Sequence, residues 1–325
     1  MTQLLPSRDT PTRIPGRRTA GWEIVALGLA IVWPFLGSQY GAGLVTEVFI
    51  FAIAAMSLDL LMGYGGLVSF GHAAFFGAGA YATVLLTMKL GWNAWAGLGA
   101  GLAVSGLVAG VIGYLCVRMA GVAFFMLTLA FAQLLFSAAM KWRWLTGGSD
   151  GIGGMARPSL FGLPLGDPTI MYFVCLAAFV LSLMALRRVI NSQFGHALVG
   201  LRENETRMRA LGYPASLVKL VAFVIAGVFA GLGGGLYAIY NGFVSPDALS
   251  FGLSGTFLLM VVLGGAGSLM GPAIGAGVFL LMKQFVSSHT DHWLLIVGVI
   301  FIACVMFFRG GIHGLIERLR TGGRA

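Results

Sequence analysis

Apolar runs long enough to cross a lipid bilayer recur along this sequence from Glu23 to Phe308, with few polar interruptions. A helix needs roughly 20 residues to span the hydrocarbon, and a run of such segments is typical of a membrane protein. Segments such as 173–186 are apolar on every side, whereas the strands of a membrane barrel alternate apolar and polar residues. The sequence therefore predicts an all-α fold, a polytopic bundle of membrane-spanning helices.

Composition agrees with this fold class. Of 325 residues, 58% are apolar and 10% are charged, against about a quarter charged in a soluble domain. The 50 glycines suit membrane helices that pack backbone against backbone. The net charge of +9 comes from residues at helix ends and in loops, which indicates contact with anionic membrane lipid and not with nucleic acid.

We expect about ten spans. They lie near 23–39, 44–62, 67–88, 94–117, 120–140, 169–186, 217–240, 254–264, 268–287 and 292–308. Lys and Arg gather in cytoplasmic loops, and here they cluster in both terminal segments and in 187–219. Both termini are therefore expected in the cytoplasm. The domains are then an N-terminal arm, a transmembrane permease domain and a cytoplasmic tail, at 1–21, 22–308 and 309–325.

Two glycine-rich stretches interrupt the apolar pattern, at 63–80 and at 263–277. Broken backbone at membrane depth is tolerated where it lines a cavity, which favours a translocation path beside broken helices. Close helix packing is the other interpretation of the same glycines. The candidate path residues in these stretches are Gly63, Gly65, Gly66, Ser69, Gly71, His72, Gly264, Gly265, Ser268 and Gly271.

Ionisable groups inside spans are costly and need a reason. Asp59 fits either a structural role with a bonded partner or a place on the path, and it joins the candidate path residues. His72 could line the path or pack as a satisfied core histidine. Glu47 lies near a helix end, where it can reach the interface.

The most charged connection, 187–219, contains the run ALVGLRENETRMRAL at 197–211. Leu198, Leu201, Met208 and Leu211 recur at helical spacing, and Glu203 and Glu205 each precede an arginine by four residues. This pattern predicts one amphipathic helix, ended by Gly212. Its apolar face could dock on a cytosolic partner or lie on the lipid surface.

No bond chemistry is indicated. The Gly-x-Ser-Gly pattern at 252–255 lacks a nearby base, so hydrolysis is not expected. The three cysteines lie in separate apolar segments without metal-ligand spacing, so neither a metal nor a cofactor is expected. A phosphate-binding G-x-x-x-x-G-K-[ST] loop is absent from the sequence, so ATP-driven transport would need an ATPase on another chain.

Two long motifs in order, MSLDLLMGYGGLVSFGHAAFFGAGAYA at 56–82 and GLRENETRMRALGY at 200–213, resemble the branched-chain amino acid ABC transporter permeases, most of all their LivM-type members. The resemblance covers roughly residues 40 to 310. It implies an inner-membrane importer subunit without its own ATPase site. The implied partners are a second, homologous permease, two cytosolic ATP-binding subunits and a periplasmic substrate-binding protein.

By this resemblance, the loop that meets an ATPase contains Arg202, Glu203, Asn204, Glu205, Arg209, Leu211 and Gly212, with Leu201 and Met208 on its apolar face. Branched-chain amino acids are the leading solutes, and urea, short amides and aromatic compounds stay open. A secondary transporter or channel coupled to an ion gradient, with Asp59 and Glu47 as the coupling site, is the alternative function.

Overall fold

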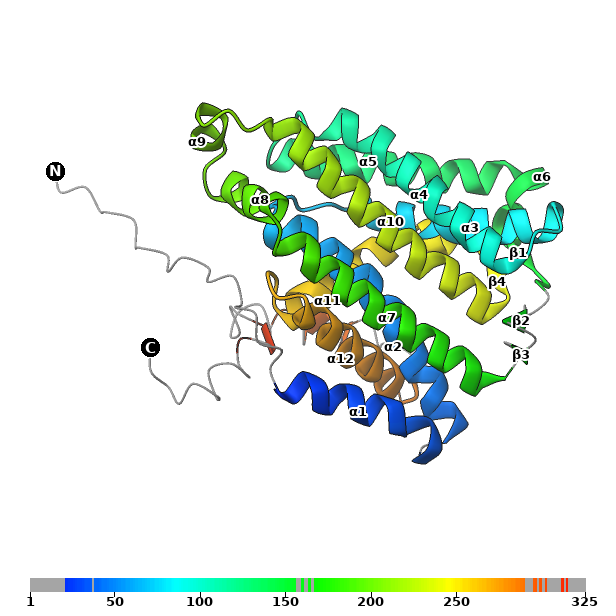
Figure 1. Cartoon of the computed structure of the whole chain (residues 1–325). Helices are drawn as coiled ribbons and strands as arrows, with labels where there is room; N and C mark the ends of the chain where they lie inside the picture. Colours follow the sequence, from blue (N-terminus) through cyan, green and yellow to red (C-terminus); the bar gives the residue numbers. More distant parts are fainter. Residues whose placement is uncertain are drawn as a thin grey trace.

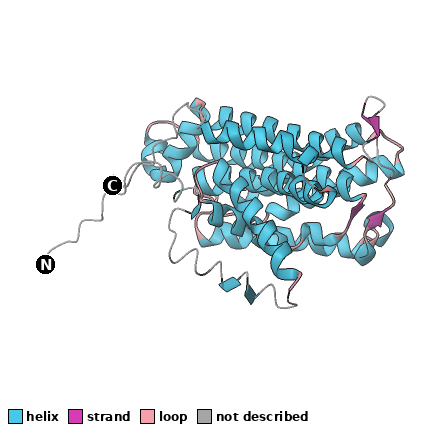
Figure 2. Ribbon diagram, turned by 90° about the horizontal axis from the view of Figure 1, so that it is seen from below, coloured by secondary structure: helices cyan, strands magenta, loops and turns pink. Residues whose placement is uncertain are grey.

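The computed structural model describes residues 21–36, 38–155, 159–160, 163–164, 167–289, 295–296, 298–299, 302, 311–312 and 314. Long helices run side by side along one direction (Figures 1 and 2). In the first half, the elements are α1 (Gly21–Leu36), α2 (Gln39–Asp59), the π-helical turn η1 (Leu60–Tyr64), α3 (His72–Lys89), α4 (Ala94–Cys116), α5 (Val122–Lys141), α6 (Arg143–Thr146) and η2 (Gly148–Asp150).

The second half begins with three short strands and ends with the α11–α12 pair. Its elements are β1 (Ile152–Gly153), β2 (Ser159–Leu160), β3 (Leu163–Pro164), α7 (Pro168–Ile190), α8 (Gln193–Glu203), α9 (Glu205–Ala210), α10 (Ala215–Asn241), β4 (Phe243–Val244), η3 (Pro246–Leu249), α11 (Phe251–Gly264) and α12 (Met270–Ser287).

The predicted membrane helical bundle is confirmed. Six of the described helical segments are long and apolar enough to cross a membrane, namely α2 with η1, α4, α5, α7, α10 and α12. Three further predicted spans correspond to α1, α3 and α11, which are shorter or less apolar. The last one, 292–308, lies mostly outside the described residues, as do residues 1–20 and nearly all of the tail at 309–325.

Side-chain caps fix where several helices begin. The hydroxyl of Ser38 accepts from the Gly41 amide at the start of α2, and the Asn93 side chain accepts from the Trp95 amide at the start of α4. Asp167 caps α7 in the same way, with a proline in the first turn. These caps fix the starts of three helices at the β1–β4 end of the bundle (Figure 1).

The core is built by close glycine contacts between α2, α3, α4 and α10. A Cβ on Gly79 would lie 2.4 Å from the carbonyl oxygen of Gly231, and one on Gly234 would lie 1.8 Å from that of Phe76. Such backbone approach is how membrane helices associate without a hydrophobic driving force. In the span formed by α2 and η1, 78% of the most apolar 18-residue stretch is buried inside the protein, whereas the corresponding share in α5 is 22%. The second span is therefore central and α5 is peripheral.

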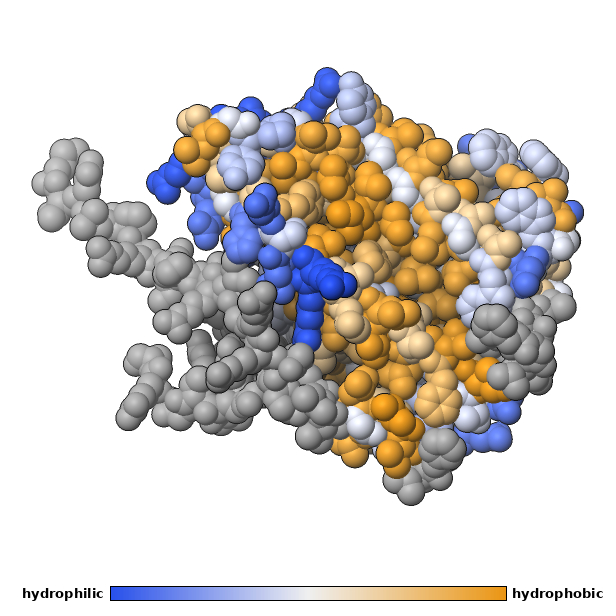
Figure 3. All heavy atoms as spheres, viewed as in Figure 1, coloured by the Kyte–Doolittle hydropathy of each residue, from blue (hydrophilic) through white to orange (hydrophobic). Residues whose placement is uncertain are grey.

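The bundle has two polar ends separated by a broad apolar band (Figure 3). At one end lie α8 and α9; at the other lie α6 and the pair formed by β1 and β4 (Figure 1). The pair is antiparallel and aligns Ile152 with Val244. The segment 141–168 thus contributes short elements to the β1–β4 end.

Candidate functional site

The first glycine stretch interrupts the chain between α2 and α3. The α-helix passes into the π-helical turn at Leu60–Tyr64, and residues 65–71 are irregular until α3 begins at His72. Gly66 has φ of +67°, a conformation that L side chains rarely adopt. π-Turns inside helices are rare and occur often at functional sites. The predicted helix break is confirmed here.

The second stretch forms the connection between α11 and α12. Gly265 and Gly267 have φ of +106° and +86°, and the Gly271 amide donates to the carbonyl of Ser268 at 2.7 Å. A Cβ on Gly264 would lie 1.8 Å from the Gly271 carbonyl oxygen, so the two helices touch at the backbone. This part of the chain needs glycine for close approach as well as for its turn.

The two breaks meet, although they are 208 residues apart in sequence. Asp59 is fully buried, and its Oδ1 accepts from the Gly267 amide at 2.7 Å. A Cβ on Gly63 would lie 2.3 Å from the same amide nitrogen. The structure thus brings Asp59 and Gly63 of the first stretch together with the turn of the second, at the α8–α9 end of the bundle.

Arg202, the last basic residue of α8, completes this cluster. Its Nη1 donates to the carbonyl of Gly63, and a Cβ on Gly66 would lie 2.9 Å from its Cγ. Its guanidinium also interacts electrostatically with Asp59, whose Oδ2 has no hydrogen-bond partner among the described residues. The α8–α9 loop therefore contacts the first interrupted helix directly, through the bond from Arg202 to the Gly63 carbonyl. We call Asp59, Gly63, Arg202 and Gly267 the break junction.

Two other predicted path residues, Ser69 and His72, lie at or just before the start of α3. The Ser69 hydroxyl accepts from the Gly71 amide at 3.2 Å. His72 is fully buried, its Nε2 lies 2.7 Å from the Ser57 hydroxyl, and its ring packs on Phe75. These contacts suit the packing interpretation, and the buried Nδ1 of His72 has no hydrogen-bond partner among the described residues. Ser254, in the Gly-x-Ser-Gly pattern, accepts from the Ala73 amide at 3.0 Å and so helps to hold α3 against α11.

The prediction of one continuous helix over 197–211 is wrong. The chain breaks at Asn204, where φ is −156°, and α9 starts anew with the Asn204 side chain accepting from the Arg207 amide at 2.8 Å. Asparagine competes in this way with helix continuation. The break leaves Glu203 unpaired with Arg207, both described residues, whereas Glu205 pairs with Arg209 at 2.7 Å.

Much of the apolar stripe of this loop is covered by the chain itself. Leu201 is 4% exposed and Leu198 is fully buried. A Cβ added to Gly65 would lie 3.3 Å from Leu198 Cδ1, and Met208 packs on Gly200. The expectation that the whole stripe needs an outside surface is therefore corrected. Leu211 is 68% exposed at the end of α9, where Gly212 turns with φ of +87°. The exposed part of the loop is therefore most of α9 and this turn.

Lys219 ties α9 to α10. Its Nζ lies 2.6 Å from Glu205 Oε2, and its side chain is 7% exposed. The hydrogen bond from Lys219, together with that from Arg209, holds the pKa of Glu205 below its usual 4.5. A lowered carboxyl pKa stabilises the fold above the unfolded value, and this contribution is lost as pH falls through the folded value.

Glu205→Gln should therefore loosen α9. We expect faster amide hydrogen exchange in residues 206–210 at pH 7, with Glu203→Gln as a control that changes little, because Glu203 has no ion pair to lose within the described residues. In the unmodified chain, protection should hold between pH 7 and pH 5 and decline below 4.5. Equal exchange in the two variants would show that the Glu205 pairs do not hold α9.

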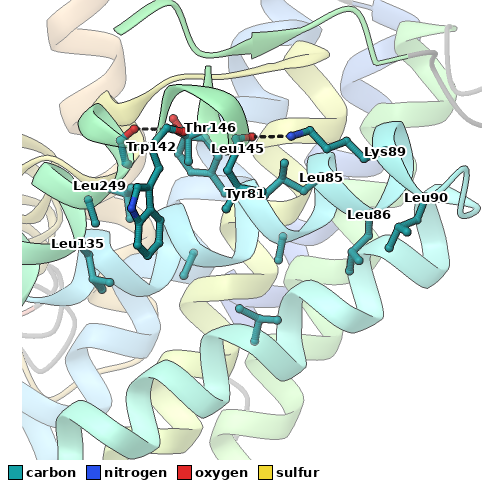
Figure 4. Close-up of a pocket in the computed structure, with 15 residues that line it drawn as sticks. Tyr81, Leu85, Leu86, Lys89, Leu90, Leu135, Trp142, Leu145, Thr146 and Leu249 are labelled. Atoms are coloured by element: carbon teal, nitrogen blue, oxygen red, sulfur yellow. Dashed lines mark hydrogen bonds between the residues drawn. The ribbon is translucent and has the colours of Figure 1, made fainter. Parts of the chain in front are cut away.

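A pocket of 540 Å³ lies at the other end of α3, between α3, α5 and α6 (Figure 4). Its walls are mostly apolar, with Leu85, Leu135 and Trp142 among them. Lys89 closes one side by donating to the Trp144 and Leu145 carbonyls at 2.7 and 3.3 Å. The pocket does not include the break junction.

The sequence did not identify Gly267 as the donor to Asp59 or Lys219 as the donor to Glu205. Only the fold brings the two residues of each pair together. Among the described residues, no group of three His, Cys, Asp or Glu side chains could hold a metal ion.

Comparisons with known proteins match the chain to one family. The family model described as "Branched-chain amino acid transport system / permease component" covers residues 41–305. The chain is 29% identical over 309 residues to the "High-affinity branched-chain amino acid transport system permease protein LivM" of Salmonella typhimurium, covering 88% of this chain and 73% of that one. The protein of the same name from Escherichia coli K12 is 29% identical over 316 residues, covering 89% and 73%.

A more distant relative is the "Autoinducer 2 import system permease protein LsrC" of Escherichia coli O9:H4, 26% identical over 226 residues, covering 66% of this chain and 63% of that one. No solved structure matches the chain significantly. Since the family model spans most of the sequence and both interrupted helices, the chain belongs to the branched-chain amino acid transport system permease component family.

Proposed function

We propose that this chain is the membrane-spanning permease subunit of an ABC importer for branched-chain amino acids or related small solutes. Family membership and the names of the relatives support the transport role. The observation that carries the proposal is the break junction, where Arg202 of the α8–α9 loop binds the first interrupted helix and Asp59 of that helix binds the second. Motion of the loop would then act directly on both breaks.

The partners in this proposal are a second, homologous permease subunit, two cytosolic ATP-binding subunits and a periplasmic substrate-binding protein. Both termini and the α8–α9 end face the cytoplasm of an inner membrane, in line with the basic residues of 187–219. The β1–β4 end faces the periplasm. The chain itself breaks no bond and uses no cofactor, since ATP is hydrolysed on the partners.

Coupling to an ion gradient is the alternative function. The contacts of Asp59 count against it, because one oxygen already accepts from Gly267 and the Arg202 cation lies near the carboxylate. A coupling ion would have to compete with that cation.

The test is uptake of labelled leucine into vesicles that hold the assembled complex. We expect uptake to need ATP and an intact ATPase subunit, and to persist when ionophores collapse the sodium and proton gradients. Uptake that stops with the gradients and ignores ATP would overturn the proposal in favour of ion coupling.

Leu211→Asp tests where the ATPase docks. Leu211 is exposed and makes no core contact, so the aspartate should leave the permease folded while charging the proposed interface. We expect at least about a tenfold loss of co-purified ATPase, equivalent to roughly 1.4 kcal/mol of binding. Met119→Asp is the matched control, since Met119 is 49% exposed between α4 and α5. Equal ATPase recovery in both variants would place the docking surface elsewhere.

A further inference from the structure

The outward face of α5 is unlike the other membrane-facing surfaces of this chain. α5 is the least buried of the described spans, with 22% of its most apolar window inside the protein. One face packs inward through Phe124, Thr128 and Ala139. The opposite face is exposed along the whole helix and carries Val122, Met126, Ala130, Gln133, Ser137 and Met140. We call this set the α5 outward face.

Gln133 lies near the middle of this face, 11 residues after Val122 and 8 before Lys141. It is the only exposed amide or charged side chain so far from both ends of a described span. Its carboxamide makes no hydrogen bond within the described part of the chain. At 1.5 Å per residue, it stands about 12 Å or more from either helix end, near mid-bilayer depth.

A carboxamide in that position cannot be left in lipid without cost. It has two donors and an acceptor, and the hydrocarbon offers partners to none of them. An unsatisfied polar group in such surroundings costs several kcal/mol. The exposed face of α4 shows the composition that lipid accepts, with Val104, Leu107 and Val111 in its middle. Water or a polar solute at the α5 outward face would satisfy Gln133.

The neighbours of α5 connect this face with the first helix break. Phe70, in the irregular segment before α3, packs edge-on against Phe125 with ring centroids 4.7 Å apart, and its amide donates to the Thr128 hydroxyl at 3.2 Å. Phe70 also stacks on Phe251, the first residue of the short helix α11, which is 46% exposed. The inner face of α5 therefore rests on the two elements that interrupt the bundle.

We infer that the α5 outward face lines the water-filled translocation path and that the Gln133 carboxamide is its polar contact for a small zwitterionic solute at mid-membrane depth. The inference rests on the proposed import function. A carboxamide can donate to a carboxylate and accept from an ammonium group, so one side chain can serve both ends of an amino acid. It carries no charge that would hold the solute too tightly to be released.

The test compares the accessibility of α5 and α4 in the assembled complex. Gln133→Cys and Leu107→Cys are made in a chain whose Cys116, Cys175 and Cys304 are replaced by alanine, and each is treated with a charged, membrane-impermeant methanethiosulfonate. This reagent needs a hydrated thiolate. We expect Gln133→Cys to react at least about tenfold faster than Leu107→Cys, and excess leucine to slow it. Equally slow reaction at both positions would overturn the inference.

A second variant gives a readout of transport. Gln133→Leu should leave assembly and ATP hydrolysis intact while lowering leucine uptake at least about tenfold, and Gln133→Asn should restore part of it. Unchanged uptake in Gln133→Leu would also overturn the inference, because a lipid-facing position tolerates leucine. ATP-driven uptake by the unsubstituted complex is measured first, and its absence would contradict the import function. The labelling contrast decides the α5 surface by itself.

Discussion

Gly63→Ala should prevent the permease from reaching its native packing. The new Cβ would lie 2.1 Å from Asp59 Oδ1 and 2.3 Å from the Gly267 nitrogen, the two atoms that are hydrogen-bonded to each other. Overpacking a core costs roughly 1–3 kcal/mol, and a clash with backbone belongs at or above the upper end. We expect a lower thermal midpoint in detergent and little monodisperse protein by size exclusion.

Gly99→Ala is the control, because an added Cβ there meets no atom within 4 Å. Replacing glycine by alanine inside a helix should stabilise it by up to about 1 kcal/mol. The comparison also separates the two interpretations of the glycine stretches. Loss of folded protein supports close packing, whereas a well-folded Gly63→Ala complex without uptake supports a path at this glycine. A variant as stable and active as Gly99→Ala would contradict the geometry of the break junction.

Arg202→Ala should uncouple the loop from the interrupted helices. The substitution removes the donor to the Gly63 carbonyl and leaves Asp59 buried without a nearby cation. A hydrogen bond from a charged donor contributes about 1.5–3 kcal/mol, and the bond from Arg202 to the Gly63 carbonyl is of this kind. We expect reduced thermal stability and loss of leucine uptake, with the ATPase subunits still bound, since the α9 surface is unchanged.

The matched experiment is a double-mutant cycle with Asp59→Asn. Asp59→Asn keeps the shape of the side chain and removes the negative charge that Arg202→Ala leaves without a nearby cation. The double variant should therefore be more stable than Arg202→Ala alone. Arg207→Ala is the control on the same loop, because the structure gives the Arg207 side chain no ion pair with a described residue. Additive effects of the two substitutions on the thermal midpoint would show that Arg202 and Asp59 do not interact.

The sequence predicted the elements better than their contacts. Apolar length placed the helices that the structure describes in the predicted spans, and the positions of glycine placed both helix breaks. Their meeting could not be foreseen, since Asp59 and Gly267 are joined by tertiary packing alone. The contact that Arg202 makes with the Gly63 carbonyl is equally non-local. Residue types at these positions were informative, but only the fold supplied the pairing.

The error at Asn204 has a local cause that the sequence did contain. Helical spacing of leucines favoured one helix, while the asparagine side chain offered an N-cap to α9 through the Arg207 amide. The break at Asn204 lets Met208 of α9 pack back on Gly200 of α8, while Leu201 of α8 stays in the core. Gln133 was overlooked although it is the only amide in the predicted span 120–140. Its position halfway along that span was the available signal.

The short helix α11 has a consequence for how the protein is made. Its 14 residues are about 21 Å long at 1.5 Å each. This length is less than the roughly 30 Å of hydrocarbon that a spanning helix must cross. α12 follows after a turn of five residues, 265–269, and meets α11 at the Gly264 and Gly271 backbones. We therefore expect α11 and α12 to enter the bilayer together, as a hairpin whose turn carries the second helix break.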